Sequence, residues 1–269
     1  MEAEIFPQPK FIRSSCPVLL CHGYGAFVNF VKPGLLHEVA MFLRSHGIAA
    51  FAPNIVPYAT IETRAEAWFK IIPQVLEHTG ASQLNIIAHS MAGLDIRYAL
   101  FAFPELEKSV KSVVTIASPH HGTSLAELAF KAPDFVKENF LKLSDWLGNK
   151  WYSDMKSDTS GALKQLTRGY VTGEFESKVG KPIVPFYSVS AACGKGTDNP
   201  IPTALRGFNL WIYEKEGIND GFISEESARF GTHLKTIPFS HSEQILIQVS
   251  SDMKEKVCDF WLELIASLP

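Results

Sequence analysis

The stretch LNIIAHSMAGLDIRY, from Leu84 to Tyr98, decides the fold of this chain. Its first five residues form a short apolar run, which is typical of a buried parallel strand. From Met91 onward, small residues are followed by helix formers, so we predict a helix that packs back onto the sheet. Almost no loop separates the two elements, and such a sharp turn presents Ser90 at the carboxyl end of the sheet. This is the geometry of a nucleophile elbow, usually written G-x-S-x-G.

The elbow carries alanine in the two places where that pattern has glycine, at positions 88 and 92. Strand and helix backbones approach each other closely at these places, so small side chains are required. Alanine is the next smallest residue, and Gly93 follows directly. We therefore predict that Ser90 is a nucleophile. The alternative is a plain strand-to-helix turn.

Further strands and helices are predicted on both sides of the elbow. Apolar runs predict strands over 16–21, 48–53, 109–117, 182–190, 208–213 and 234–239, and helical periodicity predicts helices over 33–46, 61–79 and 243–268. Strands that alternate with helices at this spacing form βαβ units and a parallel sheet. We expect one α/β domain over residues 1–269, with a mostly parallel central sheet flanked by helices.

The segment from residue 124 to 180 differs from the rest because its apolar and aromatic residues recur at helical spacing without a convincing strand. An insertion over the carboxyl-end face of a sheet is the usual place for a cap or lid. Two interpretations remain open. The aromatic residues form the core of an ordinary helical subdomain, or part of this apolar face meets lipid or another acyl chain when the site opens.

Composition excludes several classes of protein. The net charge of −3 and the pI near 6.3 give no basic field for nucleic acid, and no stretch has the ~20 apolar residues of a membrane span. The N-terminus has no secretory signal. The protein is expected in the cytoplasm if this sequence is full length, and secreted if it is a processed mature form. The four cysteines, at 16, 21, 193 and 258, show no metal-ligand spacing and are expected to be mostly reduced and buried.

A serine nucleophile needs a base, and the base needs an acid that orients it. His241 follows the last predicted strand and precedes the closing helix, and Asp220 lies in an Asn-Asp-Gly turn after the preceding predicted strand. The order Ser90, Asp220, His241 is the chain order of the α/β-hydrolase fold. His120 and His121 lie on the correct side of the sheet but come before any suitable acid. Asp220 alone could equally be an ordinary turn residue.

Two main-chain amides are expected to stabilise an oxyanion. The amide of Met91 directly follows the nucleophile at a helix N-terminus, and the second should come from the loop after the first strand, at Tyr24. Asp95 and Arg97 follow the elbow and could pair on one helix turn. We assign these two a packing role.

The motifs together resemble the bacterial true lipases of the α/β-hydrolase superfamily, the group typified by Pseudomonas and Burkholderia lipases. The resemblance implies Ser90 as nucleophile, Asp220 as acid, His241 as base, and oxyanion amides at Tyr24 and Met91. It also implies hydrolysis of acyl esters under a helical lid. The matching segments are Val18–Gly23, Ala88–Leu94, Ala117–Thr123, Asn219–Gly221 and Ser240–His241.

Two features of that family are poorly preserved. Glu243 and Ile247 stand where its calcium ligands would be aspartate and glutamine, and its disulfide is not evident. We therefore expect no cofactor, with calcium as the one candidate and Asp198 as a possible further ligand. The expected partner is an acyl-ester or lipid substrate, met through the cap. The alternatives are a soluble short-chain esterase or thioesterase with the same triad, and a non-catalytic lipid-binding homologue.

Overall fold

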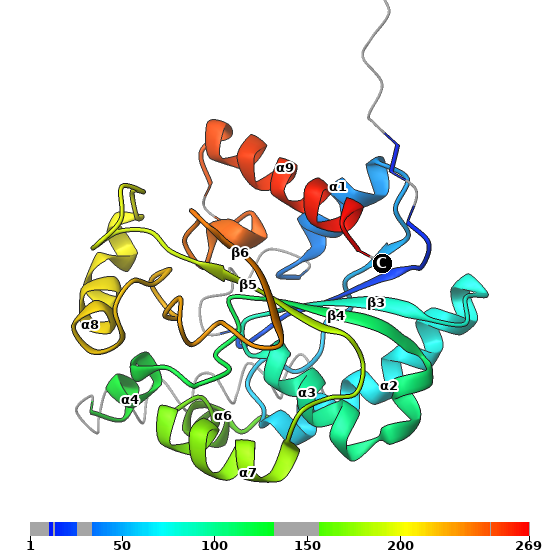
Figure 1. Ribbon diagram of the computed structural model, residues 1–269, viewed down its shortest axis with the longest axis horizontal. Helices are drawn as coiled ribbons and strands as arrows, with labels where there is room; N and C mark the ends of the chain where they lie inside the picture. The colour runs from blue at the N-terminus through cyan, green and yellow to red at the C-terminus, as the bar shows by residue number, and fades with distance from the viewer. Residues whose placement is uncertain (1–10, 13, 26–33, 132–155, 248, 269) are drawn as a thin grey trace, which may run out of the picture.

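The computed structural model describes residues 11–12, 14–25, 34–131, 156–247 and 249–268. Within these ranges the centre is a six-stranded sheet in which all neighbouring strands are parallel, with strand order β2-β1-β3-β4-β5-β6 (Figure 1). The predicted parallel sheet is confirmed. The strands are β1 Val18–Cys21, β2 Ala50–Phe51, β3 Leu84–His89, β4 Val110–Ile116, β5 Phe186–Ala191 and β6 Thr232–Ile237.

Helices cover both faces of the sheet (Figure 1). One hydrophobic cluster joins the sheet to α1 (His37–Ser45) and α9 (Ser251–Ala266), with Trp261 fully buried in it. A second cluster joins the other face to α2 (Ile61–Thr79) and α3 (Ala92–Ala102), with Trp68 at its centre. The short 3-10 helix η1 (Pro104–Lys108) leads into β4. Strands β1, β3, β4 and β5 are almost entirely buried, which explains their apolar runs, whereas most residues of the edge strand β6 are exposed.

The bounds of α2 show how local sequence sets an element. The side chain of Thr60 accepts a hydrogen bond from the amide of Thr63 and so caps the first turn. Gly80 ends the helix in the left-handed conformation, at φ 67°. The helix runs from Ile61 to Thr79 with Pro73 inside it, and both predicted ends are confirmed.

The predicted strand over 208–213 is wrong, because these residues lie in helix α8 (Arg206–Glu216), which follows the 3-10 turn η3 (Thr203–Leu205). The aromatic and β-branched residues of this run have high strand propensity, but Asn209 and Ile212 are its buried positions. Their spacing of three is a helical period. Tertiary contacts of Asn209 therefore outweigh the local preference, and Asp220 follows a helix rather than a strand.

The closing helix also begins later than predicted. Residues Glu243–Ile245 form an isolated 3-10 turn, η4, which ends at Leu246 with φ 61°. Helix α9 begins only at Ser251, where the hydroxyl of Ser250 accepts a hydrogen bond from the amide of Met253. The break separates the loop that carries His241 from the helix that packs on the sheet.

Four helical segments, and no strand among the described residues, lie between 124 and 180. They are α4 Ser124–Lys131, α6 Thr159–Gln165, the π-helix η2 Tyr170–Phe175 and α7 Glu176–Val179. Their apolar residues pack on Ile61, Met91 and Leu94 beside the elbow. The predicted cap aromatics from 135 to 152 lie outside the described residues. In the described ranges, no helix has the length and apolar character to cross a membrane.

Candidate active site

Ser90 lies at the tip of the turn between β3 and α3 and has φ 59°, a left-handed conformation that is uncommon for residues other than glycine. Its amide donates to the carbonyl oxygen of Ile116 over 2.9 Å, which ties the turn to β4. A Cβ atom built on Gly93 would lie 2.4 Å from Ser118 Oγ. The close approach of helix and strand is thus permitted by Gly93, while Ala88 and Ala92 are fully buried without difficulty.

The structure brings the three predicted triad side chains together. His241 Nε2 lies 2.9 Å from Ser90 Oγ, and His241 Nδ1 lies 2.7 Å from Asp220 Oδ2. Because an ionised carboxylate only accepts, Nδ1 carries the proton, and Nε2 is left to accept a proton from the serine hydroxyl. Asp220 is fully buried and His241 is 6% exposed.

Asp220 is held as a charged group. Besides the contact with His241, its Oδ1 accepts hydrogen bonds from the amides of Phe222 (2.9 Å) and Ile223 (2.8 Å). Burial raises the pKa of this carboxyl group, but the His241 imidazole and the hydrogen bonds outweigh burial, so the pKa lies below its usual value. A carboxylate with this pKa stays ionised at neutral pH and can stabilise an imidazolium.

The residue that sequence reasoning missed is Gln244, which is fully buried in η4. Its Nε2 donates to Asp220 Oδ2 over 2.9 Å, and its Oε1 lies 3.1 Å from Nε2 of His89. His89 therefore faces Gln244 rather than serving as a base. In the sequence, the one sign of a role for Gln244 in the site is its position three residues after His241, and this signal is weak.

The loop after β1 packs directly against the elbow. A Cβ atom built on Gly23 would lie 2.6 Å from Ser90 Cβ and 2.8 Å from the amide nitrogen of Met91, so only glycine fits there. His22 shapes this loop, because its Nδ1 bonds the carbonyl oxygen of Gly23 over 2.9 Å and its Nε2 accepts from the amide of Ile55. Burial lowers the pKa of His22 to about 3, so it is neutral.

The amide of Met91 is at the N-terminus of α3, and it donates to no acceptor among the described residues. Tyr24 follows Gly23, and its ring packs edge-on against Tyr58 at 5.4 Å between ring centroids. The hydroxyl of Tyr58 donates to the carbonyl oxygen of Gly25 over 2.7 Å and fixes the end of the loop. The two predicted oxyanion residues thus lie on segments that contact each other beside Ser90.

Comparison with known proteins agrees with this geometry. The family model described as alpha/beta hydrolase fold matches residues 17–174. The chain belongs to the α/β-hydrolase fold family. The predicted fold is therefore confirmed, and the matched region contains the elbow and the loop after β1.

Two relatives and one solved structure illustrate the similarity of this α/β hydrolase. A triacylglycerol lipase of Burkholderia plantarii is 34% identical over 117 residues, which cover 41% of this chain and 31% of the relative. Triacylglycerol lipase 2 of Saccharomyces cerevisiae is 32% identical over 242 residues, covering 87% of this chain and 67% of the relative. The mature lipase of Bacillus licheniformis has a TM-score of 0.66 at 19% identity, covering 97% of this chain and 96% of that one.

These matches differ in coverage and identity, and so in what they support for this chain. The first bacterial relatives are matched over about a third of their own length, so their specificity is not transferred to this hydrolase. At 19% identity the Bacillus licheniformis structure supports the fold alone.

Asp95 and Arg97, to which we assigned a packing role, do not pair with each other. Asp95 Oδ2 accepts from Arg64 Nε over 2.8 Å, and both side chains are fully buried between α2 and α3. Arg97 instead pairs with Glu176 of α7 at 2.8 Å and lies 3.8 Å from the centroid of the Phe230 ring. Neighbours on one helix turn face different elements here, so each has a packing role with a partner distant in sequence.

Glu243, one of the residues considered for calcium in this α/β hydrolase, has other partners. Glu243 Oε2 accepts hydrogen bonds from the amide of Ser240 (2.8 Å) and from its hydroxyl (2.7 Å). No cluster of three or more His, Cys, Asp or Glu side chains suited to a metal ion occurs in the described ranges. The donor set therefore does not fit the family's calcium site. All four cysteines are free thiols; Cys21 and Cys193 are buried and the other two half-buried.

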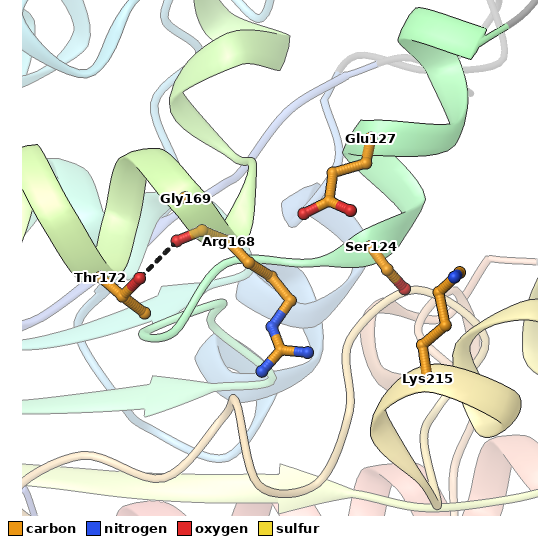
Figure 2. A pocket seen from close by; sticks show the side chains of 6 residues that line it. All are labelled: Ser124, Glu127, Arg168, Gly169, Thr172 and Lys215. Carbon is orange, nitrogen blue, oxygen red and sulfur yellow. Dashed lines mark hydrogen bonds between the residues drawn. The ribbon is translucent and has the colours of Figure 1, made fainter.

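A polar hollow of about 480 Å³ lies between α4, α8 and the start of η2 (Figure 2). No triad residue lines it, and two cationic side chains and a carboxylate do, so it is unsuited to an apolar acyl chain. Near it, Glu216 accepts hydrogen bonds from the amide of Ser124 (2.6 Å) and the hydroxyl of Ser224 (2.9 Å). The lining residues are Ser124, Glu127, Arg168, Gly169, Thr172 and Lys215.

Proposed function

We propose that this α/β hydrolase is a serine carboxylic-ester hydrolase, a lipase or esterase that forms an acyl-enzyme on Ser90. The observation that carries the proposal is the chain of contacts from Ser90 Oγ to His241 Nε2 (2.9 Å) and from His241 Nδ1 to Asp220 Oδ2 (2.7 Å). Nucleophile, base and acid at hydrogen-bond distance, with the nucleophile on a left-handed turn, are the arrangement that activates a serine. The relatives named as triacylglycerol lipases support an ester as the substrate.

The proposed reaction proceeds through two similar half-reactions. Ser90 Oγ attacks the ester carbonyl carbon while its proton passes to His241 Nε2. The tetrahedral intermediate collapses, the carbon–oxygen bond to the alcohol breaks, and the alcohol leaves with that proton. Water then attacks the acyl-enzyme and gives a proton to His241, which returns it to Ser90 as the carboxylic acid departs. Asp220 stays ionised and stabilises the imidazolium in both steps.

The negative charge on the tetrahedral oxygen requires donors that are already in place. We assign the amides of Met91 and Tyr24 to this role, because the close packing of Gly23 on the elbow brings their segments together. Loss of one such donor typically costs ~10²–10³ in rate. We propose that the triad and oxyanion residues act within one domain over 1–269. The cap expected over 124–180 is proposed as a lid over the acyl group.

The first test is Ser90→Ala. This variant should lose hydrolysis of p-nitrophenyl butyrate, by a factor of about 10⁴ or more, because no other group replaces the nucleophile. Thermal unfolding should change little, since the hydroxyl is removed without a cavity in the core. Labelling of the unmodified protein by a fluorophosphonate, absent in the variant, checks the covalent step. Retained hydrolysis in Ser90→Ala contradicts the assignment.

The acyl preference separates the finer alternatives. A specificity of the Pseudomonas and Burkholderia type, with lipid substrates met through the cap, predicts that activity rises with chain length from acetate to palmitate and increases at an interface. A short-chain esterase or thioesterase predicts the opposite trend with chain length. Binding of acyl chains without fluorophosphonate labelling would instead identify a non-catalytic lipid-binding protein.

A further inference from the structure

Gln244 shares one carboxylate oxygen with the proposed base. Asp220 Oδ2 accepts from His241 Nδ1 over 2.7 Å and from Gln244 Nε2 over 2.9 Å. The second hydrogen of the same amide group points to the carbonyl oxygen of Phe239, at 3.3 Å. Gln244 is fully buried, so no water competes for these contacts.

The orientation of the Gln244 amide group is fixed by its neighbours. Asp220, when ionised, can only accept, so the nitrogen of the amide must face it and the oxygen must face His89. Burial, with the nearby His241, lowers the pKa of His89 to about 3. His89 is therefore neutral and donates from Nε2 to Gln244 Oε1 over 3.1 Å.

The backbone of Gln244 is held as firmly as its side chain. Its amide donates to the carbonyl oxygen of Ser240 over 3.2 Å, and its own carbonyl oxygen accepts from the indole of Trp261 over 2.9 Å. Trp261 is fully buried in α9. The contacts connect the residue before the nucleophile, the loop of the base and the closing helix through the side chain and backbone of one residue, Gln244.

We propose that Gln244 is a positioning residue that holds Asp220 for His241 and weakens the attraction of that carboxylate for the imidazole proton. The inference rests on the proposed function. Each hydrogen bond that a carboxylate oxygen accepts disperses part of its negative charge. With two donors on Oδ2, the imidazolium formed during catalysis is stabilised less than by a singly bonded carboxylate, and it releases its proton to the leaving alcohol more readily.

The other titratable groups near this pair do not take over the role. The carboxylate of Glu243 is bound to Ser240, and His89 is neutral. Burial raises the pKa of the Cys193 thiol, with contributions from Asp220 and Glu243, so it is uncharged at neutral pH. Gln244 is thus the side-chain donor, besides His241 itself, that sets the charge on Asp220 Oδ2.

The test is the pH dependence of kcat/KM for p-nitrophenyl butyrate in Gln244→Met. The substitution keeps the side-chain length and removes the donor, so Asp220 attracts the imidazole proton more strongly. The acid limb of the profile should move to higher pH by about half a unit or more. KM should change little, because Gln244 does not reach the substrate, while kcat falls.

Gln244→Leu provides a second measurement of the same quantity. Leucine also has no donor for Asp220 Oδ2, so the acid limb should move in the same direction. Gln165→Met is the matched control. Gln165 is a buried glutamine at the end of α6, and its amide donates to Glu62 of α2 rather than to a triad residue. The control variant is expected to lose stability without a shift of the acid limb.

An acid limb of Gln244→Met that coincides with that of the unmodified protein, or lies at lower pH, overturns the inference. If Gln244→Met does not fold, Gln244→Leu decides by the same criterion. A shift of equal size in Gln165→Met would also overturn it. An unmodified protein without esterase activity contradicts the proposed function instead, whereas an active protein with unshifted Gln244 variants contradicts only this inference.

Discussion

The pKa values of two buried carboxyl groups of this α/β hydrolase are shifted in opposite directions. Asp220, in the loop after α8, and Asp95, in the helix after the elbow, are both fully buried. The pKa of Asp220 lies below its usual value, whereas burial raises the pKa of Asp95 to about 6 despite the adjacent Arg64. Equal burial therefore does not produce an equal pKa.

The difference follows from the hydrogen bonds that each carboxylate accepts. Asp220 accepts two from main-chain amides, one from His241 and one from Gln244. Asp95 uses only Oδ2, for Arg64 and weakly for the indole of Trp68 at 3.4 Å, and its Oδ1 has no partner in the described ranges. Several fixed dipoles stabilise a buried negative charge better than one cation on one oxygen does. The first arrangement suits catalysis, and the second joins two helices.

Replacing Asp220, the carboxylate that accepts four hydrogen bonds, should have the largest effect. Asp220→Asn removes the charge that stabilises the imidazolium and the acceptor that fixes the tautomer of His241. We expect a loss of about 10⁴ in kcat on p-nitrophenyl butyrate, with little change in the urea midpoint. Steady-state kinetics at neutral pH measure the loss. Activity within tenfold of the unmodified protein would show that this carboxylate does not act on the base.

Removing the single cation beside Asp95 should have the next largest effect, and on stability. Arg64 also donates to the carbonyl oxygens of Val56 and His22, so Arg64→Met removes a donor from both these acceptors and leaves the buried Asp95 carboxylate with the weak contact to Trp68 in place of an ion pair. A loss of about 3–5 kcal/mol in the free energy of unfolding is expected, measured by urea denaturation at pH 7.5. The double variant Arg64→Met, Asp95→Asn is the control and should recover part of it. A loss below about 1 kcal/mol would contradict the comparison.

The raised pKa of Asp95 predicts a smaller, pH-dependent effect. The pKa of Asp95 is about 6 in the folded protein, whereas in the unfolded chain the carboxyl group loses its proton near the ordinary aspartate pKa of 3.8. The resulting stabilisation is full below pH 3.8 and is lost as the pH rises through 6. Relative to Asp95→Asn, the unmodified protein should lose about 2–3 kcal/mol of stability between pH 4 and pH 7. Parallel stability curves for the two proteins would refute the assignment.

Sequence reasoning reached the fold and the proposed triad for physical reasons. Buried parallel strands are continuous apolar runs, and the elbow needs small residues on both sides of Ser90, so both leave local traces in the chain. The positions of Asp220 and His241 followed from the shared edge of a parallel sheet, where loops after successive elements meet. These inferences depend on one or two neighbouring residues and on topology.

The misses depend on contacts between residues far apart in sequence. The prediction of a strand at helix α8 is wrong because the helix depends on partners of Asn209 that lie outside it, among them Cys193 and Asn219. The sequence of residues 206–216 does not reveal these partners. The partner of Asp95 is 31 positions away, at Arg64, and Gln244 meets His89 across 155 positions. Side-chain pairing at such separations has no local pattern and requires coordinates.

The hydroxyl of Ser90 and the imidazole of His241 are separated by 151 positions along the chain. During synthesis the ribosome therefore releases the serine, together with the segment of Gly23, long before the histidine exists. The indole of Trp261, which donates to the loop of the base, is synthesised later still. A nascent chain that has not yet reached His241 therefore carries Ser90 without the imidazole that contacts it in the folded protein.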